Sequence, residues 1–106
     1  MVDRKILDEV VQRIVINYQP DKLLLYGSQA CGKEQTDSDF DLLIIKDNKL
    51  PRHKRSREVR PFLRGIKFPI DIIVYTQAEI EKWQNVKNSF IYNVLNSCEI
   101  LYERKV

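Results

Sequence analysis

The sequence predicts a mixed α+β domain: a small mixed sheet, with strands in the order first, second, third plus an edge strand, packed against helices. Continuous apolar runs at 22–27, 39–46 and 69–75 have the length and composition of strands buried on both faces. Segments with helical periodicity flank and separate them. A length of 106 residues suits one compact domain, which we expect to cover the whole chain, 1–106.

Residues 3–18 are expected to form an amphipathic helix, because apolar side chains recur there at three- and four-residue steps. Asp3 suits the N-cap, and Pro20 stops the helix. The apolar positions are Leu7, Val10, Val11, Ile14 and Tyr18.

A second helix is expected from Pro51 to about Gly65, where proline suits the first turn and glycine the C-terminal stop. Its apolar stripe comprises Val59, Phe62, Leu63 and Ile66. Pro61 removes an amide donor within this segment, so we expect it to kink or split the helix.

The C-terminal third is expected to contain two short helices and an edge strand. Thr76 and Glu79 fit a capping box that opens a helix ending near Trp83. A last helix near 88–97 and an edge strand near 99–103 complete the domain.

The net charge of +3 is concentrated in one segment. Between Lys46 and Lys67 there are nine Lys or Arg residues against Asp47 and Glu58. These cations mostly lie opposite the apolar stripe, so we expect a solvated face. A nucleic-acid partner is not favoured, because the most basic stretch, PRHKRSREVR (51–60), has no interleaved aromatic residues.

Few other residues in the sequence indicate chemistry. His53, the only histidine, lies in the basic run and is a weak catalytic candidate. Trp83 and the tyrosines are expected to serve packing, although stacking of an adenine ring on one of them stays open. No run is long enough to span a membrane, and the start lacks the apolar core of a signal peptide. Cys31 and Cys98 match no metal-ligand spacing, which favours reduced thiols in the cytoplasm.

Three carboxylates lie within or beside the predicted strands. Asp39 and Asp41 are two residues apart and therefore share a face, roughly 7 Å apart along the strand. Asp71 occupies the start of the third strand. If the second and third strands run parallel, with residues 51–65 as the crossover, all three acids meet at one end. The first strand must then run antiparallel to the second, which brings Gly27 to the same end.

Clustered carboxylates repel one another, and divalent cations remove that repulsion. Two Mg²⁺ ions held by Asp39, Asp41 and Asp71 could activate an attacking oxygen and stabilise a leaving pyrophosphate. The alternative is structural: Asp39 caps a loop and Asp41 pairs with a basic residue.

Gly27 and Ser28 end the first strand in a pattern that suits phosphate. Glycine lets the chain turn sharply and lets backbone amides approach a ligand closely. A serine hydroxyl and free amides at the start of a helical turn suit phosphate oxygens. Together with the acids, these two residues indicate a nucleoside triphosphate site.

The same residues carry a family resemblance. GSQACGKEQTDSDFDLLII, followed by PIDIIVYT, resembles the signature of the minimal nucleotidyltransferase (MNT) family within the DNA polymerase beta superfamily. That signature is Gly-Ser, a ten-residue gap, Asp-x-Asp on a strand and a further acid on a later strand. The resemblance extends over essentially the whole chain.

The resemblance implies a nucleotidyltransferase fold and Mg²⁺-dependent transfer of a nucleoside monophosphate, commonly AMP from ATP, to a hydroxyl. It implies that Asp39 and Asp41 bridge both metals, that Asp71 completes the metal that activates the nucleophile, and that Gly27 and Ser28 hold the triphosphate. The chain departs from the common GSRARG form, since Gln29 and Cys31 stand where arginines often occur.

The resemblance also implies a partner, because MNT proteins often act as antitoxins of HEPN-domain toxins and modify a toxin tyrosine. The alternatives are a non-catalytic module that neutralises a partner by contact, and a transferase acting on a nucleic-acid end or a small molecule such as an aminoglycoside. Exposed edge strands favour a homodimer or a hetero-complex.

Overall fold

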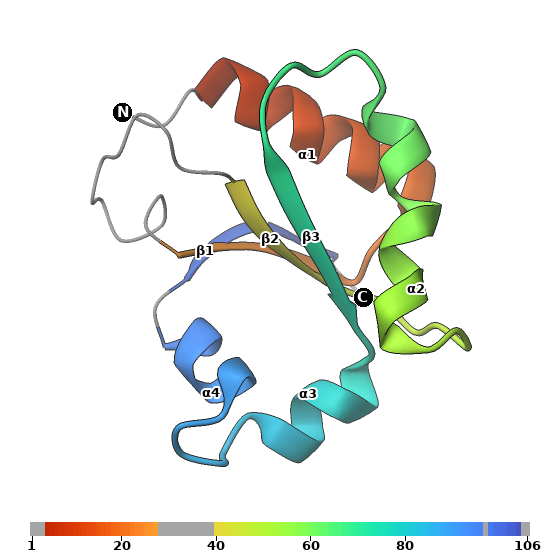
Figure 1. Cartoon of the computed structure of the whole chain (residues 1–106). Coiled ribbons are helices and arrows are strands. Elements are labelled where there is room, and N and C mark those ends of the chain that lie inside the picture. The colour runs from red at the N-terminus through yellow and green to blue at the C-terminus, as the bar shows by residue number, and fades with distance from the viewer. Residues whose placement is uncertain (1–3, 28–39, 97, 105–106) are drawn as a thin grey trace.

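The computed structural model describes residues 4–27, 40–96 and 98–104. Their core is a four-stranded sheet in the order β3-β2-β1-β4, with helices on both faces (Figure 1). The strands are β1 (Lys22–Tyr26), β2 (Phe40–Ile45), β3 (Ile70–Tyr75) and β4 (Glu99–Glu103). The predicted mixed α+β class and strand order are confirmed. No helix in the described ranges combines the length and the apolar character that crossing a membrane requires.

The strand directions are those under which the predicted acidic residues would meet at one end of the sheet. β1 pairs antiparallel with β2, and β2 pairs parallel with β3. β4 pairs antiparallel with the other side of β1, with a register shift between Leu23 and Leu24. The C-terminal end of β1 therefore lies beside the N-terminal ends of β2 and β3.

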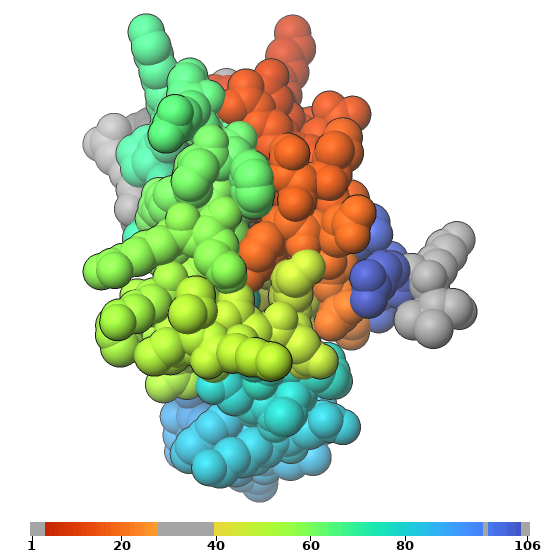
Figure 2. Space-filling view, turned by 90° about the vertical axis from the view of Figure 1, so that its right-hand side faces the viewer, coloured from red at the N-terminus to blue at the C-terminus, as the bar shows by residue number. Residues whose placement is uncertain are grey.

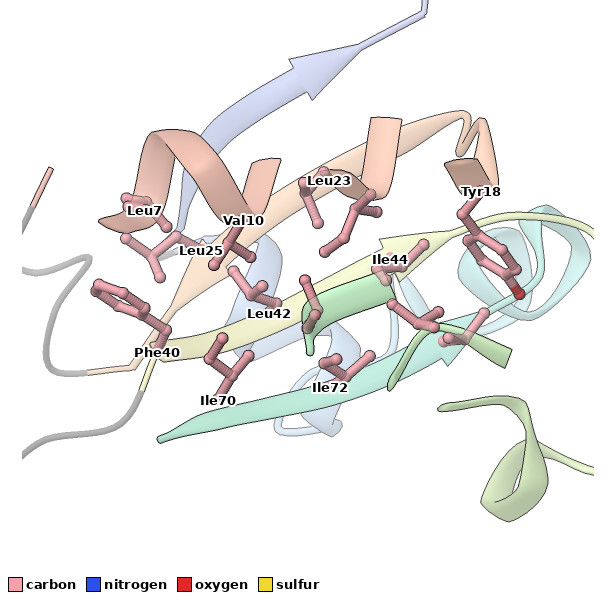
Figure 3. Packing of buried hydrophobic residues seen from close by; sticks show 14 residues of the cluster. Leu7, Val10, Tyr18, Leu23, Leu25, Phe40, Leu42, Ile44, Ile70 and Ile72 are labelled. Carbon is pink, nitrogen blue, oxygen red and sulfur yellow. The ribbon is translucent and has the colours of Figure 1, made fainter. Parts of the chain in front are cut away.

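One face of the sheet is covered by α1 (Arg4–Tyr18). Leu7, Val10, Ile14 and Tyr18 are buried at the predicted helical spacing and pack on the alternate strand residues that face them. Figure 3 shows Leu7 and Val10 directed at Leu25, Leu42 and the neighbouring sheet residues. The expected N-cap, Asp3, lies outside the described residues.

The opposite face is only partly covered, by α3 (Gln77–Trp83) and α4 (Phe90–Leu95). Ile80, Ile91 and Val94 from these helices form a second cluster with strand residues that include Leu43 and Tyr75. The predicted capping box is present: Thr76 accepts from the Glu79 amide, and the Glu79 carboxylate accepts from the Thr76 amide at 2.8 Å. The last helix is shorter than predicted, because Ser89 caps it and it ends at Leu95.

The crossover between β2 and β3 is broken into three short helical pieces instead of one helix over 51–65. These are α2 (Arg52–Arg55), η1 (Ser56–Glu58) and η2 (Arg60–Leu63). Pro61 lies within η2, so the expected split is confirmed, and Pro51 lies one residue before α2. Figure 2 shows the crossover, in yellow-green to green, forming the surface beside α1. Its Lys and Arg residues are exposed or half-buried except Arg55.

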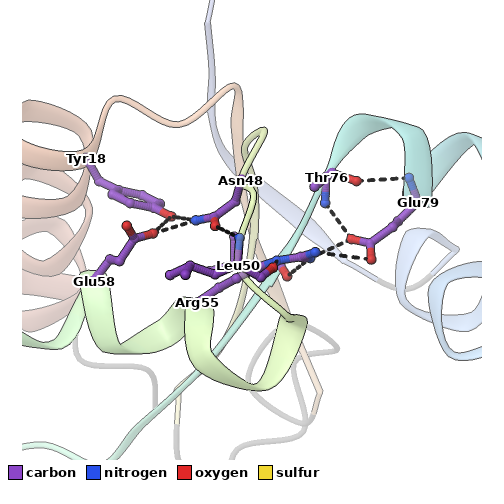
Figure 4. Close-up of polar contacts among 8 residues, drawn as sticks. Tyr18, Asn48, Leu50, Arg55, Glu58, Thr76 and Glu79 are labelled. Atoms are coloured by element: carbon purple, nitrogen blue, oxygen red, sulfur yellow. Dashed lines mark hydrogen bonds and ion pairs between the residues drawn. The ribbon is translucent and has the colours of Figure 1, made fainter.

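Arg55 departs from the expected solvated face, because its side chain is only 7% exposed. It donates to the Val74 carbonyl at 3.1 Å, to the Leu50 carbonyl at 2.8 Å and to Glu79 Oε1 at 2.6 Å (Figure 4). Burial alone would raise the pKa of Glu79, but the hydrogen bond from Arg55 and the Thr76 amide leave that pKa below its ordinary value. Arg55 thus ties the crossover to the end of β3 and to the first turn of α3.

Candidate active site

Two of the three predicted acids, Asp41 and Asp71, lie in one row across the sheet. Asp41 on β2 is directly opposite Asp71 on β3, and Tyr26 on β1 is directly opposite Asp41. Residues in register on adjacent strands share a face and lie about 5 Å apart. Leu43 and Ile73, each two residues further along, belong to the cluster under α3 and α4, so this row lies on that face. The structure therefore brings Asp41 and Asp71 together, as predicted.

The absence of a side chain at Gly27 leaves room for the Asp41 carboxylate. A Cβ atom at residue 27 would lie 2.3 Å from Asp41 Oδ2, and the backbone φ of +81° is one that L side chains rarely adopt. Glycine was predicted here for the turn and for close approach to a ligand. The described contact adds a different reason, because the Asp41 carboxylate occupies the space over the glycine.

The other predicted site residues, Ser28 and Asp39, lie outside the described residues, as do Gln29 and Cys31. Within the described ranges, no three Asp, Glu, His or Cys side chains are grouped so that they could hold a metal ion. Asp41 and Asp71 supply two carboxylates, so a third ligand from Asp39 stays a prediction. Carboxylate oxygens over a glycine that leaves room for them are chemically suited to a hard divalent cation such as Mg²⁺.

The structure adds Tyr26, which the sequence did not single out, to this row. Burial raises the pKa of Tyr26 to about 12, and the negative charges of Asp41 and Asp71 contribute to the rise. The phenol is therefore protonated at neutral pH and can donate a hydrogen bond. The signal that could have found it is its position before Gly27, because an antiparallel partner of β2 must place one side chain opposite Asp41.

His53 and Cys98 are not part of this row. His53 is exposed on α2, in line with its weak candidacy. Burial raises the pKa of the Cys98 thiol, which is half-buried beside the second cluster, so this thiol is not activated.

A family model described as "Polymerase beta, Nucleotidyltransferase" matches residues 9–106. The chain belongs to this family. Its members generally use a nucleoside triphosphate and a divalent metal. Family membership supports transferase activity. No curated protein matches the chain at a significant level.

Two solved structures share the nucleotidyltransferase fold with this family member. One is a Sulfolobus solfataricus protein assigned as a nucleotidyltransferase, with 22% identity and a TM-score of 0.65, over 94% of this chain and 79% of that one. The other is a toxin–antitoxin structure with AMP-PNP, with 14% identity and a TM-score of 0.62, over 92% of this chain and 73% of that one. At these identities the likeness shows the fold alone.

Proposed function

We propose that this nucleotidyltransferase transfers AMP from ATP, with Mg²⁺, to a tyrosine hydroxyl of a HEPN-type toxin, and that it acts as the antitoxin of that toxin in the cytoplasm. The observation that carries the catalytic part is the pairing of Asp41 with Asp71 across adjacent parallel strands, over a glycine that makes room for one carboxylate. Two in-register acids are hard to reconcile with a structural role alone, because like charges repel at this separation.

The chemistry is an in-line displacement at phosphorus. The acceptor oxygen forms a bond to the α-phosphorus, the bond from that phosphorus to the bridging oxygen breaks, and pyrophosphate leaves as the hydroxyl proton passes to solvent. When bound, Mg²⁺ would neutralise the charge that develops on the phosphate oxygens. Asp41 and Asp71, with Asp39 as the third ligand, would hold the metal, and Gly27 and Ser28 would hold the triphosphate.

The choice of adenine nucleotide and of a toxin partner has a weaker support. The toxin–antitoxin structure with the same fold was obtained with AMP-PNP, so ATP is the first nucleotide to test. The HEPN identity of the partner rests on the family resemblance in the sequence. Gln29 and Cys31 replace common arginines, which favours testing the contact-only alternative in the same experiment.

The test is incubation of the protein with α-labelled ATP, Mg²⁺ and a HEPN protein encoded beside it. We expect label on a tyrosine of that protein, and a decrease on the order of 10²-fold or more in the Asp71→Asn variant, because one charge-stabilising ligand is lost. Asp8→Asn is the matched control, since Asp8 is exposed on α1 over the other face.

Two results would contradict the proposal. Equal labelling of the toxin by the Asp71→Asn variant would show that Asp71 is not needed for the transfer reaction. Full neutralisation of the toxin by an unreactive Asp41→Asn, Asp71→Asn double variant would show that contact is sufficient, and the antitoxin would then be a binding module.

A further inference from the structure

Two adjoining hollows lie along β3 beyond Asp71, between this strand, the crossover and the helices α3 and α4. They have volumes of about 330 and 310 Å³ and share Arg52, Tyr75 and Phe90. Ile73 lines the first, and Trp83 lines the second. Side chains two and four residues beyond Asp71 on β3 lie roughly 7 and 13 Å from it, so the hollows extend along the sheet from the acids.

Phe90 connects the acid row to these hollows. Its ring lies edge-on to Tyr26, with centroids 5.5 Å apart, and is stacked near Tyr75 at 6.1 Å. Tyr26 is the residue opposite Asp41. A ligand with a phosphate at Asp41 would therefore reach Phe90 within the length of one nucleoside.

The hollows are lined by exposed aromatic rings and by Arg52, and Lys82 lies over one of these rings. Phe90 is 41% exposed and Trp83 is 38% exposed, although both are large apolar side chains. The Arg52 guanidinium lies 4.7 Å from the centre of the Tyr75 ring, and Lys82 Nζ lies 5.3 Å from the centre of the Trp83 ring. Aromatic rings and guanidinium planes are the groups on which nucleobases stack.

The most basic stretch of the sequence, PRHKRSREVR (51–60), contains no aromatic residue on which a base could stack. The fold supplies them from other elements, because Tyr75, Trp83 and Phe90 come from β3, α3 and α4, whereas Arg52 comes from the crossover. A volume near 300 Å³ is also at the size of a small-molecule site. Both observations favour a flat, polar ring as the occupant.

We propose that the Arg52–Phe90 hollow, defined by Arg52, Tyr75, Trp83 and Phe90, binds the base of a nucleotide that reacts at Asp41 and Asp71. This inference rests on the proposed nucleotidyl transfer and extends it to the second half of the substrate. Because the proposed acceptor is a tyrosine, the base is that of the nucleoside triphosphate; the end of a nucleic-acid acceptor is the alternative source. The chemistry of recognition is the same, and the test separates these sources.

Trp83 is the only tryptophan, so its fluorescence reports on the hollow. The full chain is titrated in Mg²⁺ with ATP, with adenosine, with inorganic tripolyphosphate and with a short oligoadenylate. We expect ATP and, at higher concentration, adenosine to quench Trp83, and tripolyphosphate to bind by calorimetry without quenching. Quenching by the oligoadenylate but not by ATP or adenosine would assign the base to the acceptor.

Phe90→Leu removes the stacking ring and keeps an apolar side chain against Tyr26 and Tyr75. We expect it to weaken ATP binding about 5- to 100-fold and to leave tripolyphosphate binding unchanged. Arg52→Gln is a second variant at an exposed residue, and it should weaken ATP binding in the same direction. Phe62→Leu, the same change at a half-buried residue of the α1 side, is the control.

The two proposals fail in different ways. If ATP binds no more tightly than tripolyphosphate and no base-bearing ligand quenches Trp83, the hollow does not bind a base, while the phosphate and metal chemistry stands. If adenosine quenches Trp83 but neither ATP nor tripolyphosphate binding requires Mg²⁺, Asp41 or Asp71, the hollow binds a base and the proposed transfer reaction is wrong. An unchanged ATP affinity in both Phe90→Leu and Arg52→Gln would contradict the proposal that the Arg52–Phe90 hollow binds the base.

Discussion

Replacing Gly27 by alanine tests whether the position of the Asp41 carboxylate matters for chemistry. The new Cβ would lie 2.3 Å from Asp41 Oδ2, closer than real Cβ contacts, so the carboxylate must move. The backbone φ of +81° adds a strain of about 1–2 kcal/mol for an L residue. We therefore expect a loss of stability and, separately, a loss of metal binding.

The chain contains a matched control, because Gly65 has a φ of +86° and nothing within 4 Å of its own added Cβ. Gly65→Ala carries the backbone strain without the contact. With a urea m-value of about 1–3 kcal/mol/M, a strain of about 1–2 kcal/mol lowers the unfolding midpoint by roughly 0.3–2 M in both variants. Any additional loss of stability in Gly27→Ala is then caused by the contact between the new Cβ and the Asp41 carboxylate.

The assay is Mn²⁺ binding by calorimetry in the presence of ATP, together with urea unfolding followed by circular dichroism. We expect Gly65→Ala to bind metal like the parent protein and Gly27→Ala to bind it at least tenfold more weakly. Equal metal binding by the two variants would refute the reasoning, since a displaced Asp41 would then be irrelevant to the metal.

Two further predictions concern groups with displaced pKa values. Arg55→Leu should lower the free energy of unfolding by about 2–3 kcal/mol at pH 7, because Glu79 loses its buried partner, whereas Lys54→Leu at an exposed neighbour should change it little. Since the folded pKa of Glu79 is lowered, the Arg55 contribution is complete above the ordinary value of 4.5 and fades as pH falls below it; a difference that persisted at low pH in urea unfolding would contradict this. Tyr26→Phe should be nearly neutral at pH 7. Because the folded pKa of Tyr26 is raised to about 12, ionisation of this phenol in the unfolded chain lowers the stability of the parent protein as pH rises from 10 to 12, so the variant should show a smaller alkaline decline and one tyrosine fewer titrating near 12 by absorbance.

The strand topology could be predicted because the acids and the apolar runs constrain one another. Both FDLLII and IDIIVY are apolar on the two faces, which requires strands covered on both faces, and the long connection between them permits a parallel pair. Given that pair, Asp41 and Asp71 fall in register, and the structure pairs them. The capping box at Thr76 was predictable for a local reason, since its two partners are three residues apart.

Phe90 and Arg55 could not be assigned in the same way. The site role of Phe90 depends on how α4 returns over the sheet, which brings it between Tyr26 and Tyr75, and no local pattern encodes that return. Arg55 lies in a run of cations that are mostly exposed, and only the contact with α3 distinguishes it. The positions of these side chains depend on tertiary packing, whereas the helices and strands that carry them could be predicted from the spacing of apolar residues.

The partial cover of the sheet explains why charge and apolar surface can lie side by side at this site. Along β3, the side chains that face α3 and α4 change from exposed Asp71 to half-buried Ile73 and buried Tyr75. α3 begins after β3 ends, and the cluster that it forms with α4 covers the C-terminal half of the strand. Asp71 therefore keeps much of its hydration, and its charge costs little free energy, while the apolar wall that a base requires begins two residues further along the same face.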